Sequence, residues 1–135
     1  MILAVGIDTV HLPSFRDQLA DPASTFVIGT FTAAERAYCG ARPSGDAARH
    51  LAARFAAKEA FLKAWDGAYW GREPVMEAVE LTAIEVVSDP WGRPSLQLHG
   101  EVARAVAKLG EVRAHVSLSH DGDSAVAVVT LEGRS

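Results

Sequence analysis

Two charged side chains lie on the apolar side of a predicted helix. In the segment RFAAKEAFLKAW, residues 54–65, successive residues turn by about 100°, so apolar positions should form one stripe that packs against a core. The stripe contains Leu51, Phe55, Leu62 and Trp65. Lys58 falls in its middle and Glu59 on its flank. Because burying a lone charge is costly, each needs a partner, a ligand or a wet cavity.

A further carboxylate, Asp8, lies near the end of the apolar segment ILAVGIDTV. If it approaches Glu59, the two carboxylates repel unless a cation lies between them, and hard oxygen ligands favour Mg²⁺. Lys63 lies one helical turn after Glu59, and Arg54 precedes it, so basic groups that suit phosphate flank the glutamate. The alternatives are an aspartate that caps a turn, and a salt-bridge ladder whose lysines reach solvent.

The segment HVSLSH, residues 115–120, places hydroxyl and imidazole groups at the end of a predicted strand. Alternation puts Ser119 on one face and His120 on the other, at the turn where an imidazole can reach a ligand. A serine–histidine hydrolase lacks support, because no glycine-flanked nucleophile elbow is present. A histidine that only satisfies the backbone of the turn is the alternative.

Interspersed strands and helices must position these residues. The apolar, β-branched segments 2–10, 84–87, 95–98, 115–120 and 124–132 are predicted strands. Helices are predicted after Pro13, over about 31–39 with a capping box from Thr32 to Glu35, from about 47 to 65, and over 101–110. The turn DGD between the last two strands indicates a hairpin. This order predicts an α+β fold, with a mainly antiparallel sheet packed on a long helix.

Composition limits the classes of protein to which the chain can belong. Its 135 residues, 49% hydrophobic and 22% charged, predict a single compact globular domain, 1–135, without a membrane span. The N-terminus does not resemble a signal peptide, and the single cysteine, Cys39, suits a reducing cytoplasm. The net charge of −4 argues against nucleic-acid binding. Residues 42–63 carry a local excess of basic groups, which indicates either an anionic ligand or acidic partner, or only a solvated surface.

Five motifs occur in order along the chain: GID at 6–8, FTAAE at 31–35, RFAAKEAFLKA at 54–64, WGRP at 91–94 and HVSLSH at 115–120. Together they resemble the holo-acyl-carrier-protein synthase family, the small phosphopantetheinyl transferases. The resemblance implies the 4′-phosphopantetheinyl transferase fold and a homotrimer with active sites between subunits. It also implies transfer of 4′-phosphopantetheine from coenzyme A to a serine of apo acyl carrier protein, for fatty acid biosynthesis, with release of adenosine 3′,5′-bisphosphate.

By the same resemblance, five charged residues acquire roles. Asp8 and Glu59 would be catalytic and would bind Mg²⁺ together with the pyrophosphate of coenzyme A. Lys58 and Lys63 would contact the coenzyme, and Lys63 would also assist the departing bisphosphate as a catalytic residue. Arg54 would pair with a phosphate. Glu59, through a water on the metal, is the candidate for the base that takes the serine proton.

The resemblance also assigns Gly92, Arg93 and Pro94 of the WGRP turn, and Ser119 and His120 at the strand end, to the nucleotide portion of coenzyme A.

One departure from the family concerns docking of the acidic carrier protein, for which the first helix of relatives is often rich in arginine. Here that helix supplies only Arg16, so docking would use other basic residues such as Arg42 or Arg49, or the carrier would be a domain of a larger synthase. Two rival functions stay open. One is a Mg²⁺-dependent hydrolase of the coenzyme A pyrophosphate, and the other is a non-catalytic trimeric binding module.

Overall fold

The computed structural model describes residues 1–76 and 78–134. The strands are β1 (Ile2–His11), β2 (Ile84–Ser88), β3 (Pro94–Leu98), β4 (Val112–Asp121) and β5 (Ser124–Gly133). The helices are α1 (Leu12–Ala20), α2 (Phe26–Thr30), α3 (Ala33–Gly40), α4 (Ala47–Gly67) and α5 (Gly100–Val106), with short 3₁₀ turns at Leu81–Ala83 and Ala107–Leu109. Among the described residues, no helix is long and apolar enough to cross a membrane.

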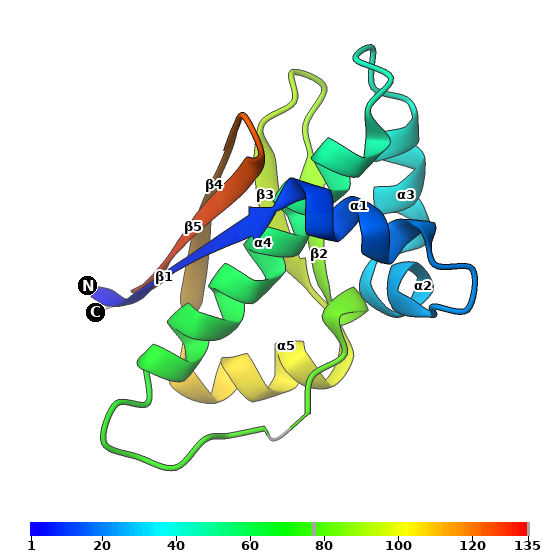
Figure 1. Cartoon of the computed structure of the whole chain (residues 1–135). Helices are drawn as coiled ribbons and strands as arrows, with labels where there is room; N and C mark the ends of the chain where they lie inside the picture. Colours follow the sequence, from blue (N-terminus) through cyan, green and yellow to red (C-terminus); the bar gives the residue numbers. More distant parts are fainter. Residues whose placement is uncertain (77, 135) are drawn as a thin grey trace.

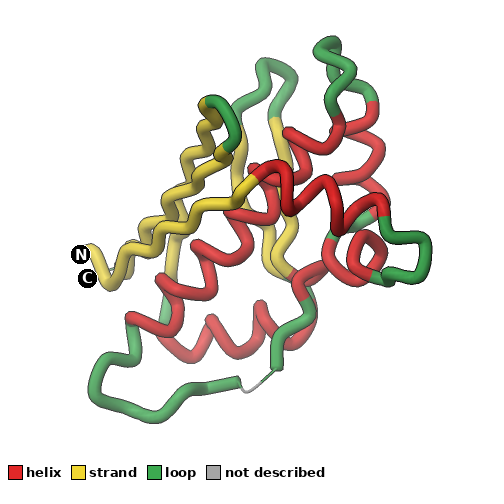
Figure 2. Tube along the Cα trace, viewed as in Figure 1, coloured by secondary structure: helices red, strands yellow, loops and turns green. Residues whose placement is uncertain are grey.

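The strands form two antiparallel sheets, one in the order β1-β5-β4 and one consisting of the hairpin β2-β3. Helix α4 packs against the three-stranded sheet and also contacts β2, α1 and α3, as Figure 1 shows. The loop that follows α4 leads back along the bottom of the molecule in this view to the 3₁₀ turn before β2 (Figure 2). The predicted α+β fold, with a mainly antiparallel sheet on a long helix, is confirmed.

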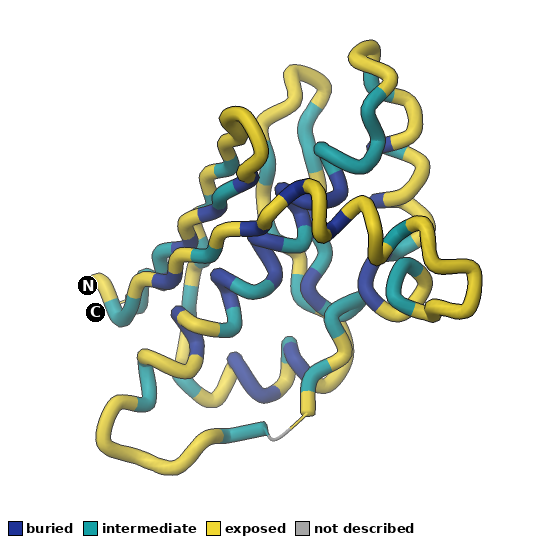
Figure 3. The backbone as a smooth tube through the Cα atoms, viewed as in Figure 1, coloured by how far each residue is buried: buried dark blue, intermediate teal, exposed yellow. Residues whose placement is uncertain are grey.

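The central strand β5 shows the alternation expected of a sheet with one covered face. Its buried residues are Ala125, Ala127, Val129 and Leu131. Opposite them, α4 presents small residues that are completely buried: Ala56, Ala57, Ala60 and Ala64. Figure 3 shows this buried side of α4 in dark blue. Small side chains let the helix lie close to the sheet.

Helix α4 passes very close to β1 at Gly6. Among the glycines of the described residues, Gly6 leaves the least room for a Cβ atom. A Cβ atom at this position would clash with the carbonyl oxygen of Ala60 and would lie 2.7 Å from the backbone nitrogen of Ala64. Gly6 pairs with Val129 of the central strand β5, so β1 cannot easily tilt away from α4. The glycine therefore allows the backbone of β1 to pack directly on the backbone of α4, two residues before Asp8.

The first two helices are held to α4 by aromatic rings. Phe15 contacts Phe26, Phe31 and Phe55, with ring centroids 5.8, 6.4 and 5.9 Å apart. Phe26 and Phe55 are closer still, at 5.2 Å, in an edge-to-face arrangement. These contacts fix α1 beside the middle of α4, so the end of β1 opens onto a surface shared by both helices.

The structure differs from the sequence-based expectation in a few elements. Helix α2 was not predicted, because five residues are too short to display a helical repeat. The helix after residue 100 ends at Val106 and continues as a 3₁₀ turn to Leu109, where Gly110 takes a positive φ of 94°. Strand β4 begins at Val112, because β5 continues to Gly133 and pairs with these residues.

Replacing Gly6 by alanine should destabilise the fold by about 3 kcal/mol, the upper end of the usual cost of overpacking. The matched control is Gly29→Ala in α2, where an added Cβ meets no atom within 4 Å. That change should be neutral or slightly stabilising, because alanine favours the helix. Urea denaturation of the two variants measures the difference. Equal midpoints would show that β1 and α4 are not in close backbone contact.

Candidate active site

Asp8, Glu59 and Lys63 come together where β1 crosses α4. Asp8 lies two residues after Gly6 on the face of β1 that meets the helix, and Glu59 and Lys63 are one turn apart on α4. The Lys63 Nζ atom donates to Asp8 Oδ1 and to the carbonyl oxygen of Ile7, both at 3.0 Å. The structure thus brings together the three residues that the sequence assigned to catalysis.

The two carboxylates influence each other. Burial raises the pKa of Glu59, the negative charge of Asp8 raises it further, and Lys63 opposes the shift. A carboxylate must lose its proton to bind a metal ion. As the pH falls, Glu59 should therefore take up its proton, and lose a bound cation, at a higher pH than an ordinary glutamate would.

Glu59 lines two cavities. One, of about 400 Å³, is also lined by Asp8, by Phe55 and by residues of α1. The other, of about 340 Å³, is largely apolar and lies between α4 and the loop that follows it, with Leu62, Trp65 and Tyr69 in its wall. A ligand with a charged part and an apolar part could therefore extend past the Glu59 carboxylate and occupy both cavities.

The donor set suits a hard divalent cation that is completed by its substrate. Within residues 1–76 and 78–134, no group of three or more histidine, cysteine, aspartate or glutamate side chains is arranged so that it could hold a metal ion. Mg²⁺ commonly takes only one or two protein carboxylates and fills its other positions with water and phosphate oxygens. Asp8 and Glu59 provide such a pair, and their mutual repulsion favours a cation between them.

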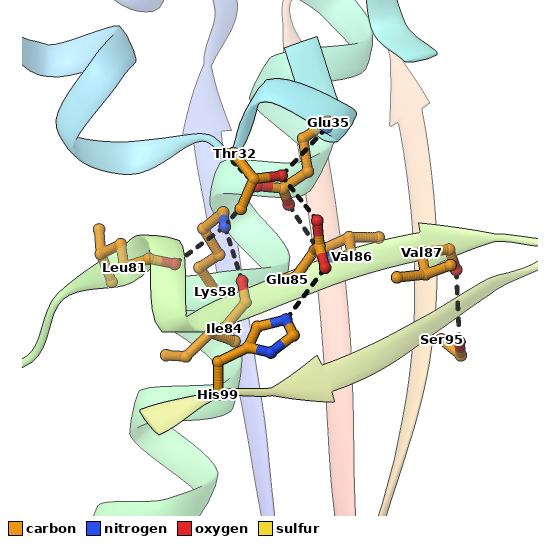
Figure 4. Close-up of polar contacts among 10 residues, drawn as sticks. All are labelled: Thr32, Glu35, Lys58, Leu81, Ile84, Glu85, Val86, Val87, Ser95 and His99. Carbon is orange, nitrogen blue, oxygen red and sulfur yellow. Dashed lines mark hydrogen bonds and ion pairs between the residues drawn. The ribbon is translucent and has the colours of Figure 1, made fainter. Parts of the chain in front are cut away.

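Lys58 does not face either cavity. Its amino group is completely buried and donates to Glu35 Oε1 at 2.9 Å and to the carbonyl oxygens of Leu81 and Ile84 at 2.9 and 2.6 Å (Figure 4). All three N–H donors are used within the core, so the predicted contact between Lys58 and the coenzyme is replaced by a structural role. Burial lowers the pKa of Lys58, and the charge of Glu35 opposes this shift.

Glu35 is the centre of this network. Its Oε1 atom also accepts from the Thr32 backbone nitrogen, and its Oε2 atom accepts from the Val86 backbone nitrogen, each at 2.9 Å. The Thr32 hydroxyl donates to Glu85 at 2.7 Å, and Glu85 contacts His99 Nε2 at 3.0 Å (Figure 4). The predicted capping box of α3 is confirmed. Its glutamate both caps the helix and pairs with the buried Lys58.

Arg54, also assigned to the coenzyme, lies in the N-terminal half of α4. The Arg54 guanidinium donates to the carbonyl oxygen of His50 and to Ser88 Oγ, and it lies over the Tyr38 ring at 4.8 Å. Its Nε atom is buried without a hydrogen-bond partner in the described part of the chain. Burial lowers the pKa of His50, and the nearby positive charges, Arg54 first among them, lower it further. His120 is one of these neighbours, so the end of β4 meets the start of α4.

The remaining predicted contacts are spread over two places. Ser119 pairs with Val126 on the outer face of the sheet, whereas His120 pairs with Ala125 on the face toward α4, as the alternation predicted. The turn between β2 and β3 contains Gly92, at a φ of +86°, while Arg93 forms an ion pair with Asp89. Pro94 starts β3. These residues of one chain do not form a single cluster with Asp8.

The sequence did not indicate the part of the site that the end of β1 and helix α1 contribute. His11, Ser14 and Gln18 line the same cavity as Asp8 and Glu59. His11 Nδ1 lies 2.8 Å from Ser14 Oγ. The signal that could have found them is positional: His11 follows Asp8 by three residues at a strand end, and Ser14 lies just after the proline that starts the helix.

A family model described as the 4′-phosphopantetheinyl transferase superfamily matches residues 4–129. The chain belongs to this superfamily. It is 48% identical over 131 residues to the holo-[acyl-carrier-protein] synthase of Mycobacterium ulcerans (strain Agy99), with 97% of both chains covered. It is 47% identical over 131 residues to the corresponding protein of Nocardia farcinica (strain IFM 10152), with 97% of this chain and 88% of that one covered.

Solved structures of superfamily members share the fold. The ACPS–CoA complex of Chronobacterium ammoniagenes gives a TM-score of 0.91 at 46% identity, with 97% of each chain covered. The acyl carrier protein synthase of Mycobacterium tuberculosis gives a TM-score of 0.77 at 43% identity, with 99% of this chain and 100% of that chain covered. The predicted transferase family and its fold are thereby confirmed.

Replacing Lys58 by methionine should destabilise the fold by about 3–5 kcal/mol, because Glu35 would keep its charge in the core without its partner. Lys63→Met, on the same helix, removes an exposed ion pair and should cost less than about 1 kcal/mol. Chemical denaturation compares the two variants. If both lost stability equally, the buried network would not be what holds α4 in place.

Proposed function

We propose that the chain transfers 4′-phosphopantetheine from coenzyme A to a serine of an apo acyl carrier protein, which makes it a holo-acyl-carrier-protein synthase. The observation that carries the proposal is the convergence of Asp8, Glu59 and Lys63 beside the two cavities that Glu59 lines, within a chain of this superfamily. Relatives at 47–48% identity bear this name, and one related structure is a complex with CoA.

Mg²⁺ is the proposed cofactor, held by the carboxylates of Asp8 and Glu59. When bound, it would neutralise charge on the phosphate oxygens of coenzyme A. Lys63 is exposed beside Asp8 and can turn from this carboxylate toward a phosphate. Its ammonium group would then stabilise the negative charge that develops on the departing adenosine 3′,5′-bisphosphate.

The basic start of α4 is proposed to hold the nucleotide part of coenzyme A. Arg54 and Glu59 are five residues apart on one helix, which places them about 7.5 Å apart along its axis. Arg54 and His120 lie near His50 at that end, so a phosphate there would meet several basic groups. The turn with Gly92, Arg93 and Pro94, and Ser119 on the outer face, are proposed to complete the nucleotide site.

The acceptor serine is proposed to enter through the cavity lined by α1. On this helix Arg16 forms two hydrogen bonds with Asp46, at 3.0 and 2.8 Å. This pairing lowers the pKa of Asp46 to about 2. Because Arg16 is already neutralised, an acidic carrier protein would have to displace Asp46 or rely on other basic residues such as Arg42 or Arg49. A cytoplasmic role in fatty acid biosynthesis is part of this proposal.

The proposed assembly is a homotrimer with active sites between subunits. Support comes from the outer face of the three-stranded sheet, where Val5, Ile7 and Val128 leave an apolar surface exposed next to one another. Contiguous apolar surface of this kind is typical of a protein interface. A subunit seated there would also meet Ser119, which the isolated chain directs away from α4.

The function is tested by intact mass spectrometry of an apo acyl carrier protein incubated with the protein, coenzyme A and Mg²⁺. We expect the carrier to gain the mass of one phosphopantetheine group. Glu59→Ala should abolish the gain because it removes a ligand of the cation, and a metal chelator should abolish it because it removes the cation itself. The matched control is Glu101→Ala, at an exposed glutamate in the first turn of α5, which should keep full activity.

Two other outcomes would contradict the transferase. Consumption of coenzyme A without any carrier modification would indicate hydrolysis of the pyrophosphate by water. No change in coenzyme A or in any of several carrier proteins, with binding of coenzyme A retained, would indicate a binding module.

The assembly is tested by light scattering coupled to size-exclusion chromatography. The unmodified protein should have the mass of a trimer, and Ile7→Lys should dissociate it, because a charge in an apolar interface is costly. Ile28→Lys, at an exposed position on α2, serves as the control and should stay trimeric. A monomeric unmodified protein would rule out the trimer.

A further inference from the structure

The cavity between α1, β1 and α4 contains a titratable group for which the proposed function has no use so far. The residues in its wall that can ionise are Asp8, Glu59 and His11. The first two are carboxylates assigned to the cation. His11 stands at the junction of β1 and α1, where the acceptor serine would enter.

The proposed transfer requires a proton acceptor, because a serine hydroxyl is a weak nucleophile until it loses its proton. Neither carboxylate suits this task. Asp8 already accepts a hydrogen bond from Lys63 at 3.0 Å, and a cation held by Asp8 and Glu59 would lower the basicity of both. An imidazole, by contrast, changes its charge between about pH 5 and 8 and is the commonest general base in enzymes.

The structure holds the His11 ring in a defined orientation. Its Nδ1 atom lies 2.8 Å from Ser14 Oγ, in the first turn of α1. The backbone beside it is fixed from the other side, because the Leu12 nitrogen donates to the Asp123 carbonyl oxygen at 2.7 Å and His11 pairs with Ser124. If Nδ1 carries the hydrogen and donates to Ser14, Nε2 is left as the proton acceptor, and this is the tautomer that a base needs.

We propose that His11 is the general base of the transfer and that Ser14 is its positioning residue; this inference rests on the proposed function. His11 Nε2 takes the proton from the hydroxyl of the carrier serine. The serine oxygen forms a bond with the β-phosphorus of coenzyme A, and the bond from this phosphorus to the bridging oxygen breaks. Adenosine 3′,5′-bisphosphate leaves with the electron pair of that bond, and His11 later returns its proton to water.

Several charged groups lie on the elements that meet at this imidazole. Asp8 on β1 and Glu59 on α4 share its cavity. Lys63 on α4 lies against Asp8. Asp123, in the turn before β5, accepts a hydrogen bond through its backbone carbonyl oxygen from the Leu12 nitrogen, and Arg16 on α1 is paired with Asp46.

The test measures kcat and KM of the full-length protein against pH, with apo carrier protein, coenzyme A and Mg²⁺. His11→Ala should lower kcat by about 10²–10⁴-fold, the usual contribution of a general base, and leave the KM for coenzyme A within about twofold. At saturating Mg²⁺, where loss of the cation at Glu59 does not limit the rate, the acidic limb of the kcat profile should disappear, and free imidazole should restore part of the rate. Ser14→Ala should lower kcat less and retain the limb.

Two variants serve as controls. His11→Gln keeps a polar side chain of similar length next to Ser14, so it separates loss of the base from loss of folding and should be as slow as His11→Ala. Glu101→Gln changes an exposed residue in the first turn of α5, away from the outer face of the sheet, and should match the unmodified enzyme. Circular dichroism verifies that all variants are folded.

The outcomes separate this inference from the proposed function. If the unmodified protein transfers phosphopantetheine and the His11 variants keep kcat within about threefold, or lose it without a change in the pH profile and without rescue by imidazole, His11 is not the base. If the unmodified protein modifies no carrier protein at all, the proposed function and the role of His11 are overturned together.

Discussion

The buried ion pair between Lys58 and Glu35 fixes the helix on which the site depends. It joins α4 to α3, and the same amino group donates to the carbonyl oxygen of Leu81, in the 3₁₀ turn, and to that of Ile84, at the start of β2. A charge in such a place is tolerated only when every donor is satisfied, so α4 has a single rotational setting. Because consecutive helical residues differ by about 100° in direction, anchoring Lys58 in the core turns Glu59 toward Asp8.

The position of Glu59 explains how one carboxylate can be partly desolvated and still reach a ligand. Burial and the charge of Asp8 raise the pKa of Glu59, and the side chain still lines an apolar cavity on one side and a cavity toward α1 on the other. Lys63 is close enough to compensate part of the charge, and its side chain is exposed, so its ammonium group can reach another anion. The site therefore holds two carboxylates that repel each other, and binding of a cation and a phosphate would relieve this repulsion.

Much of this arrangement could be predicted from the sequence, because it rests on local patterns. The capping box of α3, the long helix α4 and the opposite faces of Ser119 and His120 follow from spacing alone. The charge anomaly at Lys58 was also visible, but its cause was not, since Glu35 lies 23 residues away and its second role in the core has no local signature. The contribution of His11 was missed for a related reason: only the packing of α1 against α4 brings this strand end into the cavity.

Gly6 has a further consequence for the geometry of the site. The distance between β1 and α4 is set at this glycine by one backbone lying on another, and Asp8 follows two residues later on the same strand face. Side-chain rotamers change rapidly with thermal motion, whereas backbone atoms in a paired strand and a helix hold their places. Main-chain contact therefore sets the spacing of the backbone positions that carry the two carboxylates, and this spacing should stay constant with temperature even while the side chains themselves change rotamer.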